Sequence, residues 1–216
     1  MKKYLELLNN YSAVFLFWAM LSQIKRTIWR EKILGSYSQD YEDIEIEKLM
    51  NCAKGRYLEI GGYHPTRLSN TYRLYKKGWT GVIVEPNPEV KEIFKVIRSK
   101  DKFLNIGISE NGGNIKYYKY LIPALNSFAK INNGHKITSV ENIETRKITD
   151  IVKENFDFVS IDTEGYDAII LNNWPWKKYN PKVICVETDK VAVDKILKKQ
   201  GYQLKYQNQF NSIYYF

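Results

Sequence analysis

The fold is decided by the stretch Phe158-Val-Ser-Ile-Asp-Thr-Glu-Gly165. Its first four residues are apolar or small, which is typical of a strand buried on both faces of a parallel sheet. A second run of this kind, Val82-Ile-Val84, also leads directly into an acid, Glu85. Both stretches predict a buried strand that ends at an acidic residue.

Similar runs alternate with helical patterns along the chain. The predicted strands are Arg56–Ile60, Thr80–Glu85, Lys102–Ile108, Asp157–Asp162 and Lys182–Glu187. The predicted helices are Asp40–Met50, Leu68–Lys77, Pro88–Arg98, Lys147–Lys153, Asp167–Asn172 and Lys190–Lys199. This alternation predicts an α/β fold with a mostly parallel, twisted sheet and helices on both faces.

Other segments are less regular. Asn111-Gly112-Gly113 predicts a hairpin turn ahead of a strand at Ile115–Tyr120. Two further β-rich pieces, Gln203–Tyr206 and Ser212–Tyr215, end the chain. The stretch Leu121–Asn142 has no clear periodicity and is long for a plain loop, so we expect a functional or mobile element there.

The first 35 residues form a separate segment. Apolar side chains recur there at spacings of three and four, which predicts an amphipathic helix over residues 1–35, ahead of an α/β domain at 36–216. Its densest apolar run, Ala13–Leu21, is much shorter than the roughly 20 residues that span a bilayer. The helix is expected to pack on the domain or on a second copy of the chain. The alternative is peripheral contact with a membrane, helped by Lys25, Arg26 and Arg30.

Composition narrows the class of protein. Of the 216 residues, 44% are hydrophobic and 26% are charged, which is ordinary for a globular protein and excludes a disordered chain or a coiled-coil rod. With only two cysteines, no disulfide framework is expected, and a cytoplasmic protein is the natural interpretation. The net charge of +9 favours anionic partners or a membrane surface, but no nucleic-acid-binding motif is present.

Acidic residues stand at the ends of four predicted strands. They are Glu59, Glu85, Asp162 with Glu164, and Glu187 with Asp189. In an open parallel sheet, ligands bind beyond the carboxyl ends of the strands, at the switch in strand order. A carboxylate there is costly to bury unless it meets a cation or hydrogen-bond donors. The strand ends therefore predict a ligand that carries positive charge and hydroxyl groups.

The loop Gly61-Gly-Tyr-His-Pro-Thr-Arg67 separates two cofactor classes. It lacks the third glycine of the Gly-x-Gly-x-x-Gly turn that binds a dinucleotide pyrophosphate, and the acid at 59 would repel one. S-adenosylmethionine has no phosphate. Its cationic end suits Glu59 and Asp162, its ribose diol suits Glu85, and Gly61 with Gly62 would let the backbone approach it closely.

Five stretches together resemble the FkbM-type methyltransferases. They are Ser36-Tyr-Ser-Gln-Asp-Tyr-Glu-Asp43, Tyr57-Leu-Glu-Ile-Gly-Gly-Tyr-His-Pro65, Leu68-Ser-Asn-Thr71, Gly78-Trp-Thr-Gly-Val-Ile-Val-Glu-Pro86 and Ser160-Ile-Asp-Thr-Glu-Gly165. The resemblance implies a Rossmann-like methyltransferase fold, S-adenosylmethionine as cofactor, and methylation of a hydroxyl on a sugar, glycan or small metabolite, as in polysaccharide biosynthesis. It implies cofactor contacts at Glu59, Gly61, Glu85 and Asp162, and it does not extend to the N-terminal helix.

Methyl transfer to an alcohol needs a positioned acceptor and a group that takes its proton. Glu164 follows Asp162 by two, so on an extended segment both point the same way, and Glu164 is the first choice of base. His64, in the cofactor loop, is the second candidate for catalysis or substrate contact, against a simple loop hydrogen bond. Alternatively, the acids at the last two strand ends with His64 can hold a divalent cation.

The remaining site predictions concern the cofactor's adenine and the acceptor. Asn105 and Ser109 flank the third strand, where an adenine edge commonly lies in such folds. Ser69 and Asn70 are candidates to bond the substrate, and Trp174 is a candidate wall of the acceptor pocket.

Three other function classes stay open from the sequence alone. The first is a non-catalytic or membrane-docked interaction protein with this fold. The second is a nicotinamide-dependent oxidoreductase, although the loop at residues 61–67 argues against it. The third is an RNA-modifying enzyme, which the positive net charge suggests.

Overall fold

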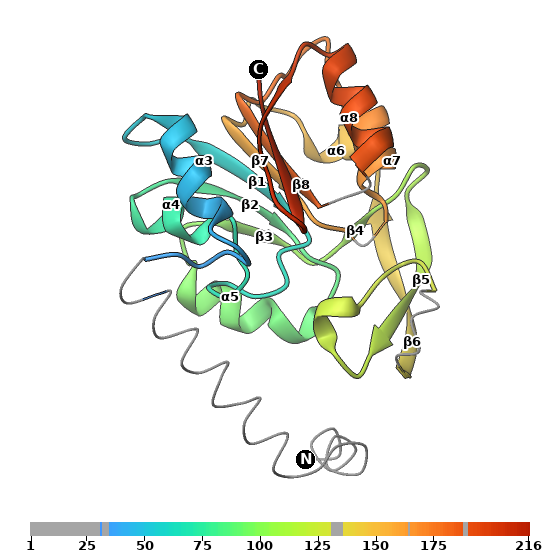
Figure 1. Ribbon diagram of the computed structural model, residues 1–216. Helices are drawn as coiled ribbons and strands as arrows, with labels where there is room; N and C mark the ends of the chain where they lie inside the picture. Colours follow the sequence, from blue (N-terminus) through green and yellow to red (C-terminus); the bar gives the residue numbers. More distant parts are fainter. Residues whose placement is uncertain (1–30, 32–34, 131–135, 164, 188–189) are drawn as a thin grey trace.

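The structure is a computed structural model that describes residues 31, 35–130, 136–163, 165–187 and 190–216. Within these residues a seven-stranded sheet forms the centre of the molecule (Figure 1). Its strands lie in the order β3 (Lys102–Leu104), β2 (Thr80–Val84), β1 (Arg56–Ile60), β7 (Phe158–Ile161), β8 (Val183–Glu187), β10 (Asn211–Tyr215) and β9 (Gln203–Gln207). The first five are parallel, and the last two are antiparallel to their neighbours. This confirms the predicted fold class.

Helices cover both faces of this sheet. One face carries α3 (Glu42–Met50), α4 (Tyr72–Lys76) and α5 (Lys91–Ile97), and the other carries α6 (Ile148–Ile151), α7 (Asp167–Asn172) and α8 (Lys190–Lys199) (Figure 1). Because side chains alternate along a strand, each strand contributes side chains to the hydrophobic cores on both faces of the sheet. In β1, Leu58 and Ile60 pack toward α6–α8, whereas Tyr57 packs toward α3–α5.

A smaller sheet lies beside the central one. It contains β4 (Gly107–Ile108), β6 (Ile137–Arg146) and β5 (Gly113–Tyr120) in that order. The predicted strand Lys102–Ile108 is therefore two strands, β3 and β4, in two different sheets. The stretch Leu121–Asn142, which has no clear periodicity in the sequence, contains a short 3-10 helix, η3 (Pro123–Leu125), and the start of β6.

Most predicted helices are a few residues shorter in the structure. The helix predicted over Leu68–Lys77 is shorter, because the chain forms a hydrogen-bonded loop up to residue 71 and α4 begins at Tyr72. The N-terminal helix predicted over residues 1–35 falls almost wholly outside the described residues. In the part of the chain that the structure describes, no helix is both long enough and apolar enough to cross a membrane.

The crossover point of the sheet lies at the carboxyl ends of β1, β2 and β7. The chain leaves β1 toward β2 on one side, and β7 lies on the other. Backbone hydrogen bonds fasten the three ends together: the N–H of Gly61 donates to Val84 O at 2.9 Å, and that of Asp162 donates to Ile60 O at 2.9 Å. Ligands bind at such a point in open α/β sheets.

Candidate active site

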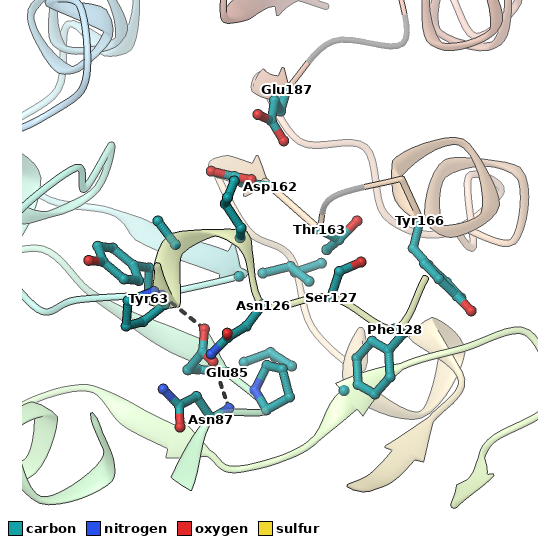
Figure 2. Close-up of a pocket in the computed structure, with 18 of the residues that line it drawn as sticks. Tyr63, Glu85, Asn87, Asn126, Ser127, Phe128, Asp162, Thr163, Tyr166 and Glu187 are labelled. Carbon is teal, nitrogen blue, oxygen red and sulfur yellow. Dashed lines mark hydrogen bonds between the residues drawn. The ribbon is translucent and has the colours of Figure 1, made fainter. Parts of the chain in front are cut away.

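A cavity of about 350 Å³ opens at this crossover point (Figure 2). Its floor is formed by the ends of β1, β2, β7 and β8, and one wall by β4, β5 and the segment 123–128. The volume is within the range of roughly 300–1,000 Å³ typical of small-molecule sites. The segment predicted to be functional, Leu121–Asn142, thus contributes part of the wall.

Glu85 lies directly after the end of β2 and is held by two backbone N–H groups. Its two carboxylate oxygens accept the backbone N–H groups of Tyr63 at 2.9 Å and Asn87 at 2.7 Å (Figure 2). Burial raises the pKa of Glu85 to about 7, although these two hydrogen bonds lower it. Each carboxylate oxygen can still accept a second hydrogen bond, so the group fits a ligand diol.

This pKa predicts a pH dependence of cofactor binding. The pKa of Glu85 in the folded protein is raised to about 7, so the acceptor-only carboxylate that a diol needs is lost as the pH falls through that value. Calorimetric titration with S-adenosylhomocysteine should show an affinity about tenfold lower at pH 6 than at pH 8. In Glu85→Gln, which cannot titrate, the affinity should be low and flat over this range. A wild-type affinity that does not change with pH would contradict the assignment.

Two further acids, Asp162 and Glu187, lie on the cavity floor. Asp162 follows β7 and Glu187 ends β8, immediately after the register partners Ile161 and Val186. Figure 2 shows both side chains on the same side of the cavity. Since neighbouring strands lie about 4.8 Å apart, two carboxylates share one region of the floor.

Behind this pair, Asp167 holds the turn that leads to α7. Thr163 donates its backbone N–H and its hydroxyl to Asp167 Oδ1, at 3.1 and 2.5 Å. Burial, with a smaller contribution from the charge of Glu187, raises the pKa of Asp167 to about 7, although the hydrogen bonds from Thr163 lower it. These hydrogen bonds hold Thr163, the residue after Asp162, against the start of α7.

Gly61 brings two strand ends closer than a side chain would permit. Its φ is +86°, and a Cβ placed there would lie 1.7 Å from the carbonyl oxygen of Asp162. Gly62, also predicted to contact the cofactor, is buried against Ile83 instead, since its Cβ would lie 2.5 Å from Ile83 Cγ2. Gly61 lines the cavity, whereas Gly62 packs the loop onto β2.

Aromatic side chains wall the cavity on the side of the small sheet. The ring centroids of Tyr117 and Phe128 are 4.9 Å apart, and those of Phe128 and Tyr166 are 5.9 Å apart. Together with Ile108 they give an apolar wall near Glu85. Such a wall suits a planar heterocycle. No periodic pattern in the sequence distinguishes these aromatic residues from core residues.

The structure corrects the predicted position of Glu59, which lies inside β1 and not after it. Its side chain therefore points to a face of the sheet, where Arg98 donates to Glu59 Oε2 at 2.9 Å and Thr71 donates to the same oxygen at 2.7 Å. Arg98 has no exposed side-chain surface and also pairs with Asp101 at 2.7 Å. This buried network is a structural support under the site, and Glu59 does not line the cavity.

The predicted roles of Ser69 and Asn70 in substrate binding are corrected in the same way. Ser69 donates to Glu59 at 3.1 Å, and Asn70 donates to Ser160 Oγ at 3.1 Å. Both side chains are buried under the sheet and neither lines the cavity.

His64 also lies outside the cavity lining. Its Nδ1 accepts the backbone N–H groups of Thr66 and Arg67, at 3.2 and 3.1 Å. Burial lowers the pKa of His64, and so does the charge of Arg67. The geometry matches the loop hydrogen bond that was the alternative to catalysis. Glu164, the predicted base, lies outside the described residues.

Three further residues predicted to contact ligands, Asn105, Ser109 and Trp174, do not line the cavity. Asn105 donates to the carbonyls of Glu85 and Pro86, at 2.9 and 3.0 Å. Ser109 shares a hydrogen bond of 2.7 Å with Thr145 because the chain turns into the small sheet after β3. Trp174 is buried in the core under α7 and donates its indole N–H to the carbonyl of residue 179.

A comparison with family models decides the class of the protein. The family model described as "Methyltransferase FkbM domain" matches residues 59–204, from inside β1 into β9. The chain belongs to the FkbM methyltransferase family. This match confirms the resemblance found in the sequence. By family and fold, the chain is an S-adenosylmethionine-dependent methyltransferase.

Solved structures similar to this FkbM chain are distant. Cofactor-bound Rv0187 from MTB is 13% identical with a TM-score of 0.48, covering 83% of this chain and 81% of that chain. A precorrin-6y C5,15-methyltransferase from Geobacter metallireducens GS-15 is 12% identical with a TM-score of 0.47, covering 82% and 88%. At these TM-scores the likenesses carry no argument about this chain. No curated protein matches it in sequence.

The cavity of this FkbM domain fits the cofactor that its family implies. Glu85 offers acceptors for a ribose diol, the aromatic wall offers an apolar surface for adenine, and Asp162 offers a carboxylate for an ammonium group. Among the described residues, no group of three or more His, Cys, Asp or Glu side chains is arranged to hold a metal ion. The alternative of a divalent cation depends on Glu164 and Asp189, which the structure does not describe, so it stays a prediction.

Proposed function

We propose that this chain methylates a hydroxyl oxygen of a sugar, glycan or small metabolite. The observation that carries the proposal is the acidic cavity at the crossover of the sheet, where Glu85 is fixed by two backbone N–H groups and Asp162 lies beside Glu187. When bound, the cofactor supplies a methyl group on a sulfonium. The chain's own residues must hold the acceptor in line and accept its proton.

In this proposal Asp162 and Glu187 have different roles. Asp162, next to Gly61 and the first cofactor loop, faces the ammonium group of the cofactor. Glu187 lies one strand further from Glu85, on the side toward Phe210, and takes the proton of the acceptor hydroxyl. The general base contributes about 10²–10⁴-fold to the rate.

The variant Glu187→Gln tests this assignment. We expect kcat for transfer of a labelled methyl group to fall by about 10²–10⁴-fold, since the amide cannot accept the proton. The dissociation constant of S-adenosylhomocysteine should change less than about threefold. Glu110→Gln, at an exposed position outside the cavity, is the matched control and should retain full activity.

A third variant, Glu164→Gln, separates the proposed base from the one that the sequence predicts. If Glu164→Gln loses turnover while Glu187→Gln retains it, the proton acceptor is Glu164 and the present assignment is overturned. If neither wild type nor control transfers a methyl group to any hydroxyl acceptor but both methylate an amine or a carbon acid, O-methylation itself is contradicted.

A further inference from the structure

The stretch Ser36–Asp43 is one of the five that resemble FkbM-type methyltransferases, and it lies before residues 59–204, which the family model matches. It forms a loop that enters the first turn of α3. Gln39, in the middle of this loop, lines the cavity. Neither the family match nor the roles of the other cavity residues explain why this loop reaches the site.

Asp43 fixes the backbone on one side of Gln39. Its Oδ1 accepts the hydroxyl groups of Ser36 at 2.7 Å and Ser38 at 2.9 Å, and its Oδ2 accepts the backbone N–H of Tyr37 at 2.7 Å. The backbone N–H of Asp43 donates to Ser38 Oγ at 3.2 Å. Asp43 is fully buried, and hydrogen bonds to an ionised group are stronger than those between neutral groups. The three residues before Gln39 are therefore held against the start of α3.

Glu42 fixes the other side of Gln39 and joins it to the hairpin of β9 and β10. One carboxylate oxygen, Oε2, accepts the backbone N–H of Asp40 at 2.7 Å. The other, Oε1, accepts the side-chain amides of Asn208 at 2.8 Å and Asn211 at 2.9 Å. Burial raises the pKa of Glu42, but these hydrogen bonds bring it below its usual value, so the carboxylate is charged at neutral pH.

The hairpin tip lies on the side of the cavity that holds the proposed base. Asn211, one of the two asparagines, is the register partner of Glu187. Phe210, the residue before it, lines the cavity, as Gln39 does. Three strands, β1, β7 and β8, separate β10 from β2, the strand that leads into Glu85. Gln39 is therefore tied to the side of the base and not to the side of the ribose diol.

The side chain of Gln39 is suited to hydrogen-bond a ligand. Its carboxamide can both donate and accept hydrogen bonds. No hydrogen bond joins this carboxamide to any other residue that the structure describes. The side chain is partly exposed, and its backbone is held on both sides by buried carboxylates. A group that is held in place before binding loses less conformational entropy when the ligand arrives.

We propose that Gln39 binds the methyl acceptor, an inference that rests on the function proposed above. Its carboxamide hydrogen-bonds a polar group of the acceptor near the atom that receives the methyl group. Glu42 and Asp43 do not line the cavity and are positioning residues, since they hold the loop and the hairpin tip in place beside Glu187.

Binding of simple glycosides to the cofactor-loaded protein tests this proposal. Isotope-labelled protein is saturated with S-adenosylhomocysteine and titrated with methyl β-glucoside, methyl β-galactoside and methyl α-mannoside. We expect at least one of them to shift the side-chain amide signals of Gln39 and the backbone signal of Thr163. In Gln39→Ala, the affinity for that glycoside, measured at Thr163, should fall about three- to tenfold, because one hydrogen bond is lost. S-adenosylhomocysteine should bind this variant as it binds wild type. Gln203→Ala, at an exposed residue of β9 outside the cavity lining, should change neither affinity.

The variant Glu42→Gln tests the positioning role, because an amide offers one oxygen acceptor where the carboxylate offers two. We expect the backbone signal of Gln39 to move and the affinity for the glycoside to fall about three- to tenfold, with S-adenosylhomocysteine binding unchanged. A general loss of structure would lower both affinities. Glu45→Gln, on the same helix, removes a surface ion pair with Lys48 and is the matched control that should change neither. If Glu42→Gln binds the glycoside as wild type does, Glu42 has no positioning role.

Three results overturn the proposal for Gln39. The first is an unchanged affinity for the glycoside in Gln39→Ala. The second is a loss of S-adenosylhomocysteine affinity in this variant as large as the loss for the glycoside, which would place Gln39 on the cofactor. The third is that none of the three glycosides shifts the signals of Gln39 in wild type. If wild type does not bind S-adenosylhomocysteine, the function proposed above is contradicted instead.

Discussion

The variant Gly61→Ala is expected to lose both stability and cofactor binding. The added Cβ would lie 1.7 Å from the carbonyl oxygen of Asp162, and the φ of +86° is unfavourable for alanine. The ends of β1 and β7 would have to separate, which displaces Asp162 and breaks the hydrogen bond from the Gly61 N–H to Val84. We expect a loss of about 3 kcal/mol or more in the free energy of unfolding, measured in urea. Affinity for S-adenosylhomocysteine should fall at least a hundredfold.

Gly113→Ala is the control for backbone strain alone. Gly113 has a φ of +91°, but a Cβ there would meet nothing within 4 Å. This variant should lose only about 1–2 kcal/mol, the usual cost of a left-handed non-glycine residue, and should bind the cofactor normally. If both variants behave alike, the close approach of β1 to β7 is not what Gly61 provides.

The variant Arg98→Met is expected to produce the largest loss of stability without touching the cavity. Arg98 has no exposed side-chain surface and donates to Glu59 at 2.9 Å, Asp101 at 2.7 Å and Thr71 at 2.7 Å. Burial raises the pKa of Glu59, and Arg98 is the main group that lowers it again. Without the guanidinium, two buried carboxylates lose their counter-charge, so the free energy of unfolding should fall by about 3–5 kcal/mol.

An exposed arginine gives the matched control for this substitution. Arg56 pairs with Glu154 at 2.7 Å, with side chains 44% and 50% exposed. Arg56→Met should cost less than about 1 kcal/mol, because exposed ion pairs contribute little. Equal losses in the two variants would show that the network under β1 does not support the site.

The parallel sheet was predictable because its strands are short apolar runs bounded by turns and helices. The small sheet was predictable only in part: a strand was expected at Ile115–Tyr120, but β6 (Ile137–Arg146) was not, since it is mostly exposed and lacks the apolar alternation of a strand that buries one face. Its partner β5 begins with exposed residues and buries side chains only toward Tyr120. A strand that is held mainly by hydrogen bonds to its neighbours, and that buries few side chains, shows only a weak hydrophobic pattern in the sequence.

The acids that line the cavity lie at or just after the last residue of a strand. Glu85 and Asp162 follow the last residues of β2 and β7 and line the cavity. Glu59 lies one residue before the end of β1, so strand alternation directs it into the core opposite Leu58 and Ile60. The alternation of side chains along a strand could have revealed that Glu59 points into the core. Nothing in the sequence marks Arg98, 39 residues away, as its partner.

The cavity as the binding site of the methyl donor is tested most directly by calorimetric titration with S-adenosylhomocysteine at pH 8. Wild type should bind one molecule per chain, and Glu85→Ala should bind at least a hundredfold more weakly, because the diol loses both carboxylate acceptors. Glu110→Ala, at an exposed position outside the cavity, should bind as wild type does. Equal affinity in Glu85→Ala and wild type, or no binding by wild type, would contradict the account.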